Sequence, residues 1–229
     1  MLPIKDDQPR ASAPFITYFL IALNVVVFLF ESTLQPRELN RFVFQFALVP
    51  QHLTAWIGGS LPAAYAFFPL LSSMFLHSGW MHIIFNMWGL AIFGDNVEDR
   101  LGHFKYLVFY LLCGLGAGVA HLVFNFGSRV PTVGASGAIA GVMGAYFLLF
   151  PGARVLTWWG FFVFWLPAWL VLGYWFVVNF LSGAATSFAT GADGAGGVAF
   201  WAHVGGFLSG VVLVKLMSPR RNVYAFEDY

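Results

Sequence analysis

Residues 130–153 read VPTVGASGAIAGVMGAYFLLFPGA and contain no charged side chain. A helix needs about 20 apolar residues to cross the roughly 30 Å hydrocarbon core of a bilayer, so this run is long enough to span a membrane. Its glycines and alanines would let neighbouring helices approach closely, as is common in membrane proteins. The run therefore predicts a transmembrane helix that starts after Pro131.

The rest of the chain has the same apolar character. Of its 229 residues, 59% are hydrophobic and 9% are charged, whereas about a quarter of the residues in a soluble domain are charged. A fold of this size cannot hide so much apolar surface from water. A formal net charge of +1 gives no basic surface for nucleic acid. The composition excludes a soluble enzyme and predicts an all-α, polytopic membrane protein.

The intervals between charged residues predict six transmembrane helices. The interval from Phe42 to Gly94 is too long for one helix and is interrupted by prolines and glycines, so we expect its first part to be an interfacial or re-entrant loop. A Gly/Ala/Ser/Thr-rich loop is expected at residues 182–198. The six predicted spans are residues 11–30, about 79–93, 106–128, 132–153, 155 to about 181, and about 200–214.

Six spans place both termini on one side of the membrane, and the basic residues indicate which side. Cytoplasmic segments carry an excess of Lys and Arg. The sequence predicts short cytoplasmic tails at residues 1–12 and 218–229 around a membrane domain at 13–217. No small-residue cleavage site follows the first apolar run, so we expect that helix to be retained. With the N-terminus inside, the inner segments carry Lys5, Arg10, Arg100, Lys105, Arg154, Lys215, Arg220 and Arg221, and the outer loops carry Arg37, Arg41 and Arg129.

Four polar residues are predicted to lie at one depth in the membrane. The even-numbered spans all enter from the outer side. Near their outer ends the second span carries His82 and Asn86, the fourth carries Ser136, and the sixth carries His203. At 1.5 Å per helical residue, each lies on the order of 5–10 Å below the outer surface. Because polar groups inside a membrane are costly, their convergence predicts a functional site.

These residue types point to nucleophilic chemistry. A serine hydroxyl is a weak nucleophile until a base removes its proton, and histidine is the usual base near neutral pH. Every Asp and Glu lies outside the predicted spans, so a serine enzyme here would use a Ser136–His203 dyad. His82 and Asn86 share a helix face. With the backbone N–H of Ser136, they could donate hydrogen bonds to an oxyanion. The depth of the site predicts a peptide bond in or near a membrane segment as substrate.

Each of the four residues also has a purely structural interpretation. Ser136 lies in a small-residue run that could serve helix packing, His203 could bind a carbonyl, and His82 and Asn86 could link helices. Their convergence favours the functional interpretation. Cys113 is predicted to be an inert buried thiol. Other polar residues without a convergent partner are predicted to be structural: Asn24, His52, His77, His121 and Asn179.

The same residues resemble the rhomboid family of intramembrane serine proteases. The resemblance covers about residues 71–215. It rests on HSGWMH at 77–82 followed by Asn86, on GASGAI at 134–139 followed by Gly141, and on Ala202-His203. Three further small or acidic positions, Gly94, Glu98 and Gly102, and two glycines after His203, Gly206 and Gly210, complete the pattern.

The resemblance implies a role for each candidate residue. Ser136 would be the nucleophile and His203 the general base, while His82, Asn86 and the Ser136 N–H would form the oxyanion site. It also implies a six-helix rhomboid-like bundle with a short fourth helix, a cavity open to outside water, a gate at the fifth helix and a cap at residues 182–198. Substrates would be single-pass transmembrane proteins in the lipid bilayer, and no metal or organic cofactor is implied.

Two departures from the family pattern stand out. No Trp-Arg pair occurs between Glu31 and Gly79, which leaves the lipid contacts of the first loop open. Ala140 stands where some members carry an aromatic residue that stacks on the histidine, so Trp201 or a glycine carbonyl remains as the group that orients His203.

Two rival functions and a location complete the predictions. A catalytically silent relative would bind membrane segments without cutting them, and a small transporter or channel would use the histidines as a proton path. Because the chain shows no extra helix and no transit-like N-terminus, we expect it in a prokaryotic inner membrane. Both termini would be cytoplasmic, and the active site would open to the outer side.

Overall fold

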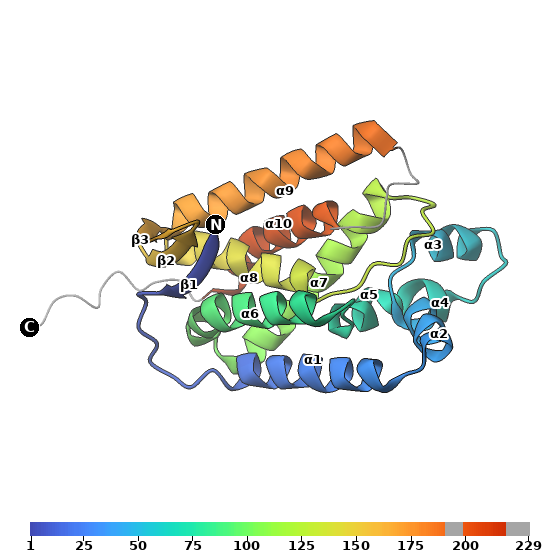
Figure 1. Cartoon of the computed structure of the whole chain (residues 1–229), viewed down its shortest axis with the longest axis horizontal. Coiled ribbons are helices and arrows are strands. Elements are labelled where there is room, and N and C mark those ends of the chain that lie inside the picture. The colour runs from blue at the N-terminus through green and yellow to red at the C-terminus, as the bar shows by residue number, and fades with distance from the viewer. Residues whose placement is uncertain (191–198, 219–229) are drawn as a thin grey trace, which may run out of the picture.

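Within residues 1–190 and 199–218, which the computed structural model describes, six long helices form the body of the protein (Figure 1). Helices α8 and α10 lie between α1 on one side and α9 on the other (Figure 1). The all-α, polytopic membrane fold predicted from the sequence is confirmed for the body of the protein, to which one small sheet is added. The six helices are α1 (Phe15–Thr33), α6 (Trp80–Leu101), α7 (His103–Phe124), α8 (Ser136–Leu149), α9 (Ala168–Thr190) and α10 (Phe200–Met217).

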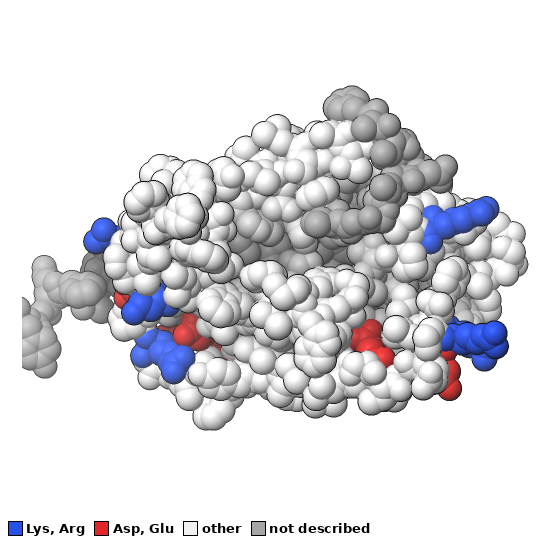
Figure 2. All heavy atoms as spheres, viewed as in Figure 1, with Lys and Arg blue, Asp and Glu red and all other residues white. Residues whose placement is uncertain are grey.

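These helices differ in how they can fit a bilayer. Among the described residues, four helices are long and apolar enough to cross one: α1, α7, α9 over Ala168–Ser187, and α10. Helix α6 ends in a charged segment that contains Asp95, Glu98, Asp99 and Arg100. On the face shown in Figure 2, charged side chains gather toward the two ends of the molecule, with a broad uncharged surface between them.

The central helix α8 is too short to cross a bilayer. Its 14 residues extend only about 21 Å at 1.5 Å per residue, compared with a hydrocarbon core of about 30 Å. Its residues from Gly137 to Tyr146 are all buried. The N-terminus of α8, where Ser136 lies, is therefore placed inside the protein rather than at a membrane surface.

The predicted interfacial or re-entrant loop is a chain of short helices, and as expected it is not one long span. Proline occupies the first turn of three of them, where its fixed φ favours a helix start and its missing N–H costs nothing. In Figure 1 these helices lie at the end of the bundle opposite the N-terminus. They are α2 (Pro36–Phe46), α3 (Pro50–Ile57), α4 (Ala63–Phe67), α5 (Pro69–Ser72) and the 3₁₀ turn η1 (Ser73–Phe75).

A small antiparallel sheet corrects the predicted start of the fifth span. Its strands, in the order β1-β2-β3, are β1 (Leu2–Asp6), β2 (Arg154–Trp159) and β3 (Phe162–Pro167). The start of the fifth span at 155 was wrong, because residues 154–167 form a hairpin before α9. Aromatic and β-branched residues favour strands there, and Gly160 adopts the positive φ of +62° in the turn. β1 lies within the predicted N-terminal tail and is fixed to α6 by a hydrogen bond from Trp88 Nε1 to the Pro3 carbonyl, 2.7 Å long.

The second boundary correction concerns the end of the fifth helix. α9 continues to Thr190, so the predicted loop at 182–198 is helical over its first part. Its remainder, residues 191–198, lies outside the described residues, as do residues 219–229 of the predicted C-terminal tail with the basic pair Arg220-Arg221.

Helices α8 and α10 touch backbone to backbone. A Cβ atom on Gly206 would lie 1.9 Å from the carbonyl oxygen of Gly137, and one on Gly210 would lie 1.9 Å from that of Gly141. Only glycine fits at such distances, so the small-residue runs of both helices form one interface. Gly137 follows Ser136 directly, and Gly206 is one turn below His203. The interface therefore sets how close these two side chains can come.

The glycine contact predicts a strong effect of one added methyl group. Gly210→Ala should destabilise the protein by about 2 kcal/mol or more, because the backbone of α8 must move to admit the Cβ. Gly173→Ala on α9 is the matched control, since its Cβ would meet only Phe147 at an ordinary 3.9 Å. Thermal unfolding of both variants in detergent measures the effect, and equal midpoints for the two variants would contradict the proposed packing.

Candidate active site

The structure brings Ser136 and His203 into direct contact. Ser136 Oγ and His203 Nε2 are 2.8 Å apart, a hydrogen-bond distance between residues 67 positions apart in the chain. Ser136 is the first residue of α8, and His203 lies in the first turn of α10. His203 is buried, with 9% of its surface exposed. A hydroxyl held against a buried imidazole is the arrangement that activates a serine as a nucleophile.

The loop before α8 is shaped by Gly134. Its φ of +129° is a conformation that residues with a side chain rarely adopt. Its N–H donates to the carbonyl of Ser73 at 2.9 Å, which ties the loop to η1. A Cβ on Gly134 would lie 2.7 Å from His82 Nε2. The glycine therefore lets the chain pass directly beside the imidazole of His82 on its way to Ser136.

His82 and Asn86 lie on α6 and border the same cavity as Ser136 and His203. This cavity has a volume of about 620 Å³. The Asn86 side chain is buried, and its Nδ2 has no hydrogen-bond partner among the described residues. The four residues predicted to converge therefore border one cavity, although they come from three helices that are far apart in the sequence. An unpaired amide donor facing a cavity is poised to bind an oxygen that enters it.

The proton on His82 can be placed from its neighbours. The backbone N–H of Ser78 points at His82 Nδ1 at 3.4 Å, and Ser78 Oγ lies 3.0 Å from the same atom. Because a backbone N–H can only donate, Nδ1 is the acceptor and the ring proton sits on Nε2. His82 therefore presents Nε2–H as a donor beside Gly134. Burial lowers the pKa of the neighbouring His77 to about 4, so His77 adds no positive charge at neutral pH.

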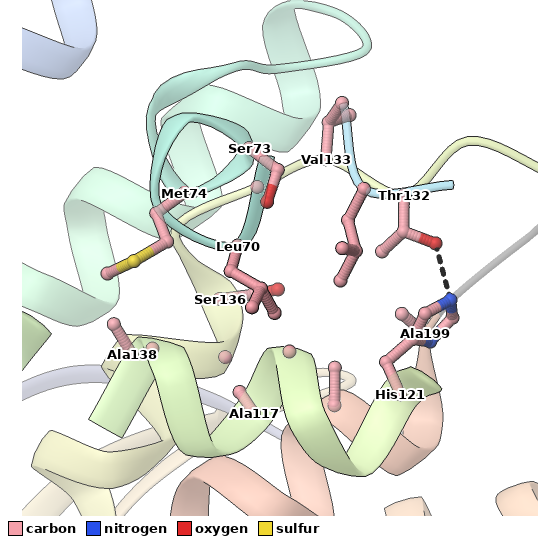
Figure 3. Close-up of a pocket in the computed structure, with 16 residues that line it drawn as sticks. Leu70, Ser73, Met74, Ala117, His121, Thr132, Val133, Ser136, Ala138 and Ala199 are labelled. Carbon is pink, nitrogen blue, oxygen red and sulfur yellow. Dashed lines mark hydrogen bonds between the residues drawn. The ribbon is translucent and has the colours of Figure 1, made fainter. Parts of the chain in front are cut away.

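A second, smaller cavity is also bordered by Ser136 (Figure 3). It has a volume of about 30 Å³ and is bordered by Ser73, Ala117 and His121 among others. His121 Nε2 and Thr132 Oγ1 are 2.8 Å apart, the bond drawn as a dashed line in Figure 3. His121 thereby holds the loop that leads to Ser136, which fits the structural role predicted for it. The cavity is large enough for a water molecule.

Asn179 is the residue that sequence reasoning missed. It was predicted to be structural and without a convergent partner, but its Oδ1 lies 2.7 Å from His203 Nδ1. Trp175, one turn earlier on α9, places its ring 5.5 Å from that of His203, centroid to centroid. The available signal was a lone amide in an apolar span, which is a functional candidate by default. The sequence could not show that the face of α9 that carries Asn179 packs against α10.

The structure rejects Trp201 as the group that orients His203. Its ring stacks on Phe124 at 3.9 Å, and its Nε1 donates to Ser187 Oγ at 2.9 Å. Two further residues predicted to be structural lie on other helices, α1 and α7. Asn24 Nδ2 donates to the carbonyl of Leu20 at 2.7 Å within α1, and Cys113 is a buried free thiol.

Comparison with known proteins gives one consistent result. Residues 64–220 match the family model described as Rhomboid domain. The chain is 31% identical to RHOMBOID-like protein 6, mitochondrial, of Arabidopsis thaliana over 161 residues, which is 69% of this chain and 47% of that protein. It is 30% identical to Rhomboid protease GluP of Bacillus subtilis over 63% of this chain and 28% of that protein.

A third relative, Rhomboid protease AarA of Providencia stuartii, is 31% identical over 57% of this chain and 49% of that protein. The chain spans about half the length of the first curated relatives it matches. The matched range includes the four residues that border the larger cavity, His82, Asn86, Ser136 and His203, and also His121 and Asn179.

The geometry predicts that Ser136 reacts covalently with a serine-directed electrophile. A fluorophosphonate should label the wild-type protein at Ser136, because His203 can accept the hydroxyl proton as the new bond forms. Ser136→Ala and His203→Gln should lose the label, whereas Ser60→Ala, a change in the exposed first loop, should keep it. Mass spectrometry of the adduct checks the site. An unlabelled wild type, or labelling that survives Ser136→Ala, would show that this hydroxyl is not activated.

Proposed function

This chain belongs to the rhomboid family, and we propose that it is an intramembrane serine endopeptidase that cleaves transmembrane segments of single-pass membrane proteins. The observation that carries the proposal is the 2.8 Å contact between Ser136 Oγ and His203 Nε2 beside a cavity of about 620 Å³. Two relatives whose names identify them as rhomboid proteases support it.

The proposed reaction begins with the attack of Ser136 Oγ on a peptide carbonyl in the cavity. His203 Nε2 takes the hydroxyl proton and then gives it to the leaving amine, which frees one product and leaves an acyl-enzyme. A water molecule, deprotonated by the same nitrogen, then attacks the ester. His203 returns that proton to Ser136 Oγ as the acyl bond breaks, which releases the second product and restores the enzyme. This proton transfer needs no carboxylate, so Ser136 and His203 can carry out both steps.

The negative oxygen that forms during the attack needs donors at fixed positions. Three groups are suited to this role: His82 Nε2–H, Asn86 Nδ2–H and the backbone N–H of Ser136. The last lies at the N-terminus of α8, where the helix dipole also favours negative charge. Such donors are worth more in a site from which bulk water is largely excluded.

The protein is an integral membrane protein, and we infer that both termini are cytoplasmic. The pairing of β1 with β2 supports this topology, because it puts the N-terminal segment at the same end of the bundle as the α8–α9 connection. The first-loop helices and the N-termini of α8 and α10 lie toward the other end (Figure 1). Relatives named as mitochondrial and chloroplastic stand beside bacterial ones, so they do not select the prokaryotic inner membrane predicted from the sequence.

The silent relative that binds without cutting is the second candidate. It predicts a site in which the serine or the histidine is missing or turned away, and here both are present and in contact. A transporter would use the histidines as a proton path, and it is disfavoured because His203 is held between Ser136 and Asn179.

Cleavage of a transmembrane substrate tests the proposal. The purified wild-type protein, incubated with a panel of single-pass substrates in detergent, should cut at least one, and Ser136→Ala should remove all cutting while its thermal unfolding midpoint stays the same. Cleavage that persists in the Ser136→Ala variant would refute the proposed serine endopeptidase function.

The oxyanion donors should have smaller and graded effects. Asn86→Ala should lower kcat about 100-fold, the usual cost of one lost donor, and leave a measurable rate. Asn96→Ala, another buried amide of α6 near its inner end, is the matched control and should keep the wild-type rate. Steady-state kinetics on one substrate measures both. An Asn86→Ala variant as inactive as Ser136→Ala, or as active as the control, would remove Asn86 from this role.

A further inference from the structure

We propose that Asn179 of α9 is a positioning residue that holds His203 in the tautomer and orientation required by the reaction, so that the site works as a Ser136–His203–Asn179 triad. This inference rests on the proposed function and deepens it. Asn179 does not touch the reacting atoms; it acts on them through the imidazole.

The contact is short and shielded from water. Asn179 Oδ1 lies 2.7 Å from His203 Nδ1, and the two residues have 7% and 9% of their surfaces exposed. On its other ring nitrogen His203 meets Ser136. The imidazole is therefore held at both nitrogens, by α9 on one side and α8 on the other, and has one orientation that satisfies both.

A second hydrogen bond fixes which way the amide of Asn179 faces. Its Nδ2 donates to the carbonyl of Trp175, one turn earlier on α9, at 2.9 Å. With the amino group bound there, the oxygen is the atom that faces His203. An amide oxygen can only accept, so His203 Nδ1 must carry the proton. Nε2 is then left with a free lone pair, which is the form of the base that can take the proton of Ser136.

An amide suits this position better than a carboxylate does in lipid. A buried ionised carboxylate carries a large desolvation cost inside a membrane, whereas a neutral amide with both of its polar atoms bonded does not. Asn179 thus supplies the orientation that an Asp supplies in soluble serine proteases, without an unpaired charge. Trp175, whose ring lies 5.5 Å from the imidazole, packs beside it from the same helix.

Removing the acceptor should slow the reaction more than it weakens substrate binding. Asn179→Leu keeps the size of the side chain but leaves His203 Nδ1–H without a partner, so we expect kcat to fall about 10- to 100-fold with little change in KM. Val178→Ala changes the preceding residue of α9, whose side chain is exposed, and should keep the wild-type rate. Unchanged kinetics in a folded Asn179→Leu variant would overturn the proposal.

A conservative variant separates positioning from mere packing. Asn179→Asp keeps an acceptor at the same place, so kcat should exceed that of Asn179→Leu. Its carboxylate favours the protonated imidazole, so the acid limb of the kcat/KM profile should move to higher pH. The other histidines that border the two cavities, His82 of α6 and His121 of α7, are the same in all three proteins. A residue that only fills space would leave the profile unmoved, and an Asp variant no better than Leu with an unmoved profile would refute the role.

The tautomer itself can be read in the wild-type protein, whether or not the variants fold. Nitrogen-15 NMR of histidine-labelled protein at neutral pH should show His203 with its proton on Nδ1, its signals being identified by their loss in His203→Gln. A proton on Nε2 would refute the inference. The outcomes also separate the two claims: if the wild type cuts no substrate, the proposed function fails, whereas if it cuts and Asn179→Leu cuts equally well, only this inference fails.

Discussion

The close contact of α8 and α10 is the constraint on which the site depends. Carbonyl oxygens of Gly137 and Gly141 occupy the space that side chains at Gly206 and Gly210 would need. Lipid tails are as apolar as the helix surfaces, so burial of apolar area does little to drive helices together in a membrane, and close packing must do so instead. Since Ser136 and His203 lie in the first turns of these two helices, the glycine interface also limits the distance between the two side chains.

The hydrogen bonding of the site's polar groups agrees with the proposed roles: groups that would need a fixed orientation are paired, and one that would bind an incoming oxygen is left free. His203 is held at both nitrogens, and His82 is held at Nδ1 by Ser78. Asn86 Nδ2, by contrast, has no partner among the described residues. Unpaired buried donors are costly in lipid, so such a group is most easily explained by an oxygen that binds there during the reaction.

Much of this arrangement could be predicted from the sequence, because charge-free runs mark membrane helices and span parity gives the depth of their polar residues. That reasoning located Ser136, His203, His82 and Asn86. It failed for residues 154–167, where a membrane-like composition hides a hairpin, since strands and helices of aromatic and β-branched residues look equally apolar. It also failed for Asn179. Helix α9 is apolar on almost all of its faces, so the spacing of its apolar residues does not indicate which face packs against α10. Tertiary packing decides that face.

The proposed reaction requires one hydroxyl and one imidazole to act together on a carbonyl inside the bundle. An experimental structure of the protein inactivated by a peptide chloromethyl ketone would show whether they do. We expect the reagent to be bonded to both Ser136 Oγ and His203 Nε2, with the former carbonyl oxygen facing His82 and Asn86. A reagent attached to other residues, or an oxygen turned away from α6, would contradict it.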